Sequence, residues 1–200
     1  MESSLTGLFR NSENMLNLLN VEAIRDILLE IPSLVRLYER QDTTFISALK
    51  DWLDRMNRIL LGNRLLIGMD FALYKGRIIS VERGLIPNEL KFRRQPSARK
   101  IKLTMCYEIL LTATKTVKEV FEPILQHFID NQERARAIVE LARLKGLIDP
   151  ALQATLNREQ IKVIWETISK NPEFSSLFIN LNVAVGQRDA FILFDRAVVS

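Results

Sequence analysis

The sequence predicts an all-α protein, a compact bundle of roughly seven to nine helices. Apolar side chains recur at steps of three and four residues through most of the chain, which is the period of an amphipathic helix. Asn–Pro and Asp–Pro pairs and isolated glycines, which are helix start and stop signals, separate these runs. With 48% apolar and 26% charged residues, the composition is that of an ordinary globular protein.

The first part of the chain contains two clear helical runs. Residues 21–40 form one, and Pro32 predicts a kink or a break near Ile31 because proline removes a backbone donor. The second run begins after Asp42, a predicted N-cap. Its apolar stripe comprises Phe45, Leu49, Trp52, Leu53, Met56, Ile59 and Leu60. Two acid–base pairs are predicted on its outer face, Asp51 with Arg55 and Asp54 with Arg58.

Residues 63–83 are apolar and contain regularly spaced glycines. These glycines, with the one just before and the one just after the run, are Gly62, Gly68, Gly76 and Gly84. The favoured interpretation is a buried helix whose glycines let a neighbouring helix pack closely. The alternative ends the helix near Lys75 and makes residues 77–82 a short strand.

A loop is predicted within residues 85–96, followed by a long helix that either Ser97 or the residue before Pro96 caps. The apolar stripe of this helix comprises Leu103, Cys106, Leu110, Ala113, Val117, Val120, Phe121, Ile124, Leu125 and Phe128. Pro123 lies inside the stripe as a kink or a restart. Gly146 is the predicted stop.

Further helix starts follow toward the C-terminus. Their signals are Asp149 before Pro150, Asn157 three residues before Gln160, and Asn171 before Pro172. Residues 181–194 fit a β-hairpin or, as we favour, two helices separated at Gly186 with Asp189 opening the last one. Trp52 and Trp165 both lie on apolar stripes, and we expect both to be buried.

The chain is expected to be a single helical domain, residues 1–200, with a softer seam at residues 85–96. Glu2 occupies a place where a secretory signal is basic, and the most apolar window, residues 65–73, is too short to cross a bilayer. The single cysteine, Cys106, has no partner for an internal disulfide. We therefore expect an intracellular, cytoplasmic and soluble protein.

Few residues are of a type that carries catalysis. His127 and Cys106 are the only histidine and cysteine, so neither a hydrolase triad nor a zinc site of Cys and His ligands is predicted. We expect His127 to be at the surface or partly buried, without a catalytic role, and Cys106 to lie in the core. Asp70 lies in the most apolar window, where we expect Arg64 or Arg77 to neutralise it. No catalytic residue, cofactor or metal is predicted.

The cationic charge is concentrated in the middle of the chain. Residues 75–145 carry 15 basic and 8 acidic side chains, a net charge of +7, against +4 for the whole chain. The segment 91–102, KFRRQPSARKIK, has six cations and no acid. Its candidates for binding an anion or a nucleic acid are Lys91, Phe92, Arg93, Arg94, Arg99, Lys100 and Lys102. The competing interpretation is a solvated segment whose charges offset acidic helices elsewhere in the protein.

These observations favour a non-enzymatic interaction, adaptor or regulatory protein that acts through contacts with a protein partner. The alternative is a nucleic-acid-binding protein that uses residues 91–102 on phosphates. A further alternative is peripheral binding to an anionic membrane through the same segment. The sequence leaves the partner and the oligomeric state open.

Overall fold

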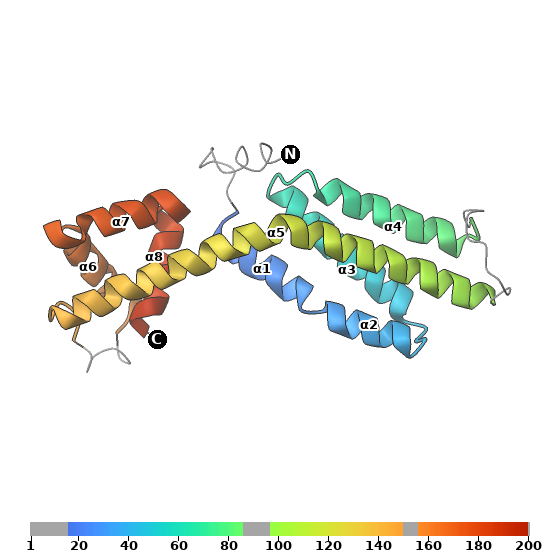
Figure 1. Cartoon of the computed structure of the whole chain (residues 1–200), viewed down its shortest axis with the longest axis horizontal. Helices are drawn as coiled ribbons and strands as arrows, with labels where there is room; N and C mark the ends of the chain where they lie inside the picture. The colour runs from blue at the N-terminus through green and yellow to red at the C-terminus, as the bar shows by residue number, and fades with distance from the viewer. Residues whose placement is uncertain (1–15, 86–96, 150–155, 200) are drawn as a thin grey trace. The chain divides into compact units, whose positions relative to one another are not determined.

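The computed structural model of the chain describes residues 16–85, 97–149 and 156–199 (Figure 1). These residues form eight α-helices and no strand, so the all-α prediction is confirmed. The helices are α1 (Leu18–Leu28), α2 (Ile31–Glu39), α3 (Phe45–Gly62), α4 (Gly68–Glu82), α5 (Ala98–Leu144), α6 (Arg158–Ser169), α7 (Pro172–Val185) and α8 (Gln187–Val199).

The chain divides into two compact units. The first unit is Leu19–Glu122, and the second is Met1–Leu18 together with Pro123–Ser200. Helix α5 contributes to both, because the boundary falls at Pro123 inside that helix. The predicted seam at residues 85–96 lies almost wholly outside the described residues, and the single domain stays a prediction.

In the first unit, the predicted break near Ile31 separates α1 from α2. Pro32 lies in the first turn of α2, where a missing backbone N–H leaves no hydrogen bond unmade. Helix α3 then begins at Phe45 with Thr44 as its N-cap. Asp42, the predicted cap, instead accepts hydrogen bonds from the backbone N and the Oγ1 of Thr44, at 2.8 and 2.7 Å.

Helix α3 forms the core of the first unit. Its buried side chains are Phe45, Leu49, Trp52, Leu53, Met56 and Leu60. Trp52 is fully buried, and its indole Nε1 donates to the carbonyl of Ile27 at 2.9 Å. The predicted partners of Asp54 and Arg55 are wrong, because Asp54 pairs with Lys75 on α4 at 2.6 Å and Arg55 pairs with Glu30.

Residues 77–82 belong to α4, so the helical interpretation is confirmed and the strand is not formed. Helix α5 begins as predicted after Ser97, whose Oγ accepts from the backbone N of Lys100 at 3.3 Å. It runs through Pro123 and stops before Gly146, which has a φ of +69°. A hydrogen bond from Leu147 N back to Ala142 O, 2.9 Å, closes this end.

The second unit packs α6, α7 and α8 against one another. Asn157 and Gln160 form the predicted capping box of α6, and Asn171 caps α7 before Pro172. Trp165 is nearly buried and meets three phenylalanine rings edge to face, those of Phe178, Phe191 and Phe194. Pro150 lies outside the described residues.

The predicted alternative of a β-hairpin at residues 181–194 is not formed. Gly186, with a φ of +82°, ends α7, and α8 begins at once at Gln187. A glycine is suited to this place because the left-handed φ strains other residues. Asp189 therefore lies inside α8 rather than before it, where it is buried and accepts a hydrogen bond from Leu18 N at 2.7 Å.

Candidate interaction surface on α4 and α5

The single cysteine and the single histidine both make contacts within the fold. Cys106 is fully buried, and this burial raises the pKa of its thiol to about 11, so the thiol stays protonated at neutral pH. His127 is half-buried, and its Nε2 lies 3.0 Å from the carbonyl oxygen of Ala184. Over the described residues, no three His, Cys, Asp or Glu side chains are grouped to hold a metal ion.

Only part of the basic segment is visible. Lys91, Phe92, Arg93 and Arg94 lie outside the described residues, whereas Arg99, Lys100 and Lys102 lie in the first turns of α5. Arg99 donates to the carbonyl of Gln41 at 2.7 Å, and Lys102 Nζ donates to the carbonyl of Glu82 at 2.9 Å. Two of these three cations therefore bind backbone carbonyls of their own unit.

An acidic side chain shares the space beside these cations. A hollow of about 360 Å³ is lined by Arg99 and Lys102 and also by Asp42. Hydrogen bonds from Thr44 hold the pKa of Asp42 below its usual range, so its carboxylate is charged at neutral pH. A carboxylate in the same hollow works against binding an anion there.

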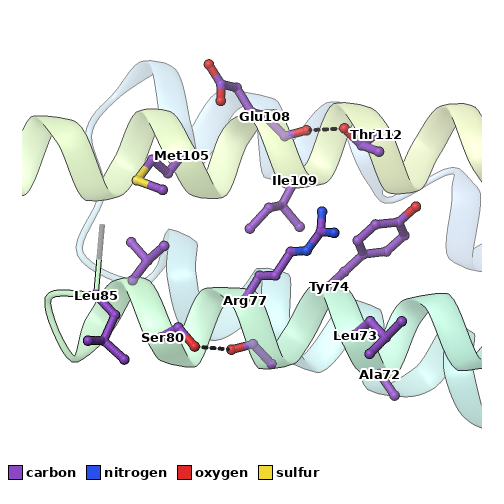
Figure 2. Close-up of a pocket in the computed structure, with 12 residues that line it drawn as sticks. Ala72, Leu73, Tyr74, Arg77, Ser80, Leu85, Met105, Glu108, Ile109 and Thr112 are labelled. Carbon is purple, nitrogen blue, oxygen red and sulfur yellow. Dashed lines mark hydrogen bonds between the residues drawn. The ribbon is translucent and has the colours of Figure 1, made fainter. Parts of the chain in front are cut away.

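A larger groove of about 720 Å³ runs between α4 and α5 (Figure 2). The two helices are joined beside it by two side-chain contacts. Tyr74 Oη and Thr116 Oγ1 lie 3.0 Å apart, and Lys102 holds the last carbonyl of α4, that of Glu82. The groove is lined by Ala72, Leu73, Tyr74, Gly76, Arg77, Ser80, Val81, Leu85, Met105, Glu108, Ile109 and Thr112.

The groove is mainly apolar. Val81 and Ile109 are buried and form its floor, whereas Leu73 is 63% exposed at its edge. Three hydroxyl groups line it and all have partners: Ser80 donates to the carbonyl of Gly76, Thr112 donates to that of Glu108 (dashed lines in Figure 2), and Tyr74 Oη lies 3.0 Å from Thr116 Oγ1. These hydroxyls therefore need no partner from a ligand.

One cation extends across the groove. Figure 2 shows the side chain of Arg77 reaching from α4 toward Ile109 on α5, while the carboxylate of Glu108 points away from it. Among the described residues, neither Arg77 nor Glu108 takes part in a side-chain hydrogen bond or an ion pair. A guanidinium group without a partner beside an apolar surface is a ready binding point for a carboxylate.

A stripe of four residues on one face of α4 runs from Met69 into the groove, since its members Leu73, Gly76 and Ser80 also line the groove. Met69 and Leu73 are 58% and 63% exposed, and Gly76 and Ser80 continue the stripe at the same spacing of three or four residues. Leu66, which is 78% exposed, precedes it. The prediction of a buried helix is therefore wrong for this face of α4.

The glycines of α4 differ in what surrounds them. A Cβ atom on Gly68 would lie 2.8 Å from Leu61 Cγ and 3.0 Å from Leu61 N, so the predicted close packing is present there. A Cβ atom on Gly76 would meet nothing within 4 Å. Gly76 therefore leaves a gap in the exposed stripe that no part of the described unit fills.

Asp70 lies on the same side of α4 as Arg77, two helical turns away. It is half-buried in the first turn, where a carboxylate is favoured by the helix dipole. The predicted ion pair with Arg64 or Arg77 is not formed, and Asp70 has no side-chain partner in the described part of the chain. The face thus carries an acid and a base that are both available to another molecule.

This surface is not among the sites predicted from the sequence. The sequence of α4 did contain one indication. Its apolar residues are distributed around the whole helix, whereas a helix that is covered on one side needs them on that side only. The location of the groove could not be predicted, since it depends on how α5 packs against α4.

Among the described residues no single helix has the length and apolar character needed to cross a membrane. Helices α7 and α8 meet that criterion only as a pair, and the chain bends by 118° between them. No family model, no curated protein and no solved structure matches the chain.

Proposed function

We propose that the protein is a non-enzymatic interaction protein, an adaptor or regulator, that binds an α-helix of another polypeptide along the outer face of α4. The observation that carries the proposal is the exposure of Met69 and Leu73, the two large apolar residues of the α4 stripe, together with Leu66 before it, at the α4/α5 groove. A contiguous apolar surface of this kind costs free energy in water and is typical of a binding site.

The shape and chemistry of the groove favour a helix over a small molecule. A small-molecule site encloses its ligand and directs several polar groups toward it. Here the hydroxyl groups of Ser80 and Thr112 bond to their own helices and that of Tyr74 contacts Thr116, so the guanidinium of Arg77 is the one polar group that reaches across without a partner among the described residues. A partner helix would place apolar side chains along the stripe, as in other helix-in-groove complexes.

The other expectations remain proposals with less support. Nucleic-acid or membrane binding through residues 91–102 is weakened at Arg99 and Lys102, which bind carbonyls of the same unit. An intracellular, cytoplasmic location suits Cys106, a free and buried thiol.

Site-specific photo-crosslinking tests the proposal. A photoreactive amino acid is placed at Leu73 and, as a matched control, at Leu19, which is also exposed and apolar but lies on α1. We expect Leu73 to give an adduct with a defined polypeptide in the native host, and mass spectrometry to place the crosslink in a helical segment. The adduct should disappear when Gly76→Gln is added. If Leu73 and Leu19 give the same adducts, or Leu73 gives none, the proposal is wrong.

A further inference from the structure

We infer that the helix bound along α4 is the α4 of a second copy of this chain, packed antiparallel about a two-fold axis. This inference rests on the proposed function and names the partner. It follows from two properties of α4, its apolar register and its charge pattern, each of which is self-complementary.

The apolar register comes from the exposed stripe of Met69, Leu73, Gly76 and Ser80. Its spacing of four, three and four residues is that of the contact positions in a two-helix coiled coil. In heptad terms, Leu73 and Ser80 occupy a positions and Met69 and Gly76 occupy d positions. In an antiparallel pair, a positions of one helix face d positions of the other. One register then sets Leu73 of each copy against Gly76 of the other, and Met69 against Ser80.

Each of these layers joins a large side chain to a small one. The gap at Gly76, where a Cβ atom would meet nothing within 4 Å, receives the Leu73 side chain of the other copy. Leu73 in turn loses the water contact that its exposed surface makes in the single chain. Large-to-small layers of this kind allow two helices to approach closely without a cavity.

The charge pattern selects the same register. Asp70 and Arg77 lie on one flank of the stripe, seven residues apart, or about 10 Å along the axis, which is too far for them to pair within one helix. In an antiparallel pair this flank meets its own copy. The register that sets Leu73 against Gly76 also sets Asp70 against Arg77, and the two-fold axis makes that pair twice.

The opposite flank adds no repulsion. There, the same register places Ala72 of one copy against Ile79 of the other, and both residues are uncharged. Lys75 is farther from the stripe and is bound to Asp54 of its own chain at 2.6 Å. No like charges of the two α4 helices therefore meet in this register. Because one helix per copy makes the contact, we expect a dissociation constant on the order of 10 µM.

Sedimentation velocity over a concentration range that brackets this value tests the inference. We expect the wild-type chain to pass from monomer to dimer. Asp70→Arg and Arg77→Asp should each raise the dissociation constant about tenfold or more, because each sets like charges against each other twice. The double variant, with both changes, should return close to the wild-type value, since it restores opposite charges in reversed positions.

A second variant tests the apolar layer without endangering the fold. Gly76→Gln fills the gap that Leu73 of the other copy needs, while the single chain has room for the new side chain and gains helix propensity. We expect the dimer to be lost and the melting temperature of the monomer to be unchanged or higher. Gly62→Gln is the matched control, since Gly62 is equally open but lies at the end of α3; it should leave association unchanged.

The outcomes separate the inference from the proposed function. A wild-type chain that remains monomeric over the whole range, or a double charge variant that does not recover, overturns the dimer. If the photoreactive group at Leu73 still crosslinks a different polypeptide under those conditions, the proposed function stands without the inference. If Leu73 crosslinks nothing and the chain is monomeric, both are wrong.

Discussion

Helices α3 and α4 pack against each other in the first unit, yet they use their apolar residues differently. Helix α3 buries most of its large apolar side chains, including Trp52 and Met56. Helix α4 buries Phe71 and Ile78 against the unit but leaves Met69 and Leu73 in solvent. The first pattern is that of a helix whose large apolar side chains are covered by folding, and the second leaves large apolar side chains exposed on one side of the helix.

The difference is one of burial on folding within one pair of helices. Burial of the α3 stripe removes apolar surface from water when the chain folds. The outer stripe of α4 stays in water when the chain folds, so it contributes little to folding, and under the proposed function it is covered in the complex. Substitutions on the two helices should therefore change different measured quantities.

The largest expected effect is on α3. Trp52→Ala removes a fully buried ring and the hydrogen bond from Nε1 to Ile27, and should lower the free energy of unfolding by about 3–5 kcal/mol. Leu73→Ala on α4 should change it by less than about 0.5 kcal/mol. Denaturant unfolding followed by circular dichroism measures both. Equal losses at the two positions would mean that the outer face of α4 is part of the core.

A smaller effect distinguishes the two glycines of α4. Gly68→Ala forces a methyl group against Leu61, and we expect a loss of about 1–3 kcal/mol in the free energy of unfolding. Gly76→Ala places the same methyl group in open space, and we expect a gain of up to about 1 kcal/mol from helix propensity. The two changes are chemically identical, so opposite signs in the same assay would come from the surroundings alone.

The smallest effect concerns the ion pair that joins α3 to the start of α2. The hydrogen bond from Arg55 holds the pKa of Glu30 below its usual range. A lowered pKa in the folded state gives stability that is present above the unfolded pKa of about 4.3 and is lost as the pH falls through the folded value. Both side chains are 42% exposed, so the pair contributes at most about 1 kcal/mol.

Glu30→Gln measures this contribution. The variant should be slightly less stable than the wild type at pH 7, and the difference should shrink as the pH is lowered below 4.3 or so, where Glu30 becomes protonated in the wild type. Denaturant unfolding of both proteins, at pH 7 and again at a pH below about 4.3, gives the difference in their free energies of unfolding. A gap between the two proteins that does not change with pH would assign the loss to packing of the side chain rather than to its charge.

Local signals in the sequence predicted local structure well. Ser97, Asn157 and Gly146 lie at helix ends as expected, because capping depends on atoms only a few residues away. The ion pairs of α3 were wrong for the opposite reason. A charged residue four positions away on the same helix competes with charged residues from distant parts of the chain, and Asp54 pairs with Lys75 of α4 instead of with Arg58.

The candidate site depends on relations that the sequence pattern does not contain. An apolar residue such as Met69 or Leu73 indicates that burial is favourable, and it does not tell whether folding or binding provides it. The groove requires α5 to lie beside α4, and Lys102 contributes to that by binding the carbonyl of Glu82. Gly186 was ambiguous because a left-handed φ suits both a hairpin turn and a helix end.

The chain has two tryptophans, and each unit contains one of them. Trp52 reports on the first unit and Trp165, inside its ring of phenylalanines, on the second. A Trp165→Phe variant would therefore emit only from the first unit, and a Trp52→Phe variant only from the second. Emission curves recorded during denaturation would coincide if the chain unfolds as one cooperative block. Two separate midpoints would mean that the long helix α5 connects two bodies that melt independently.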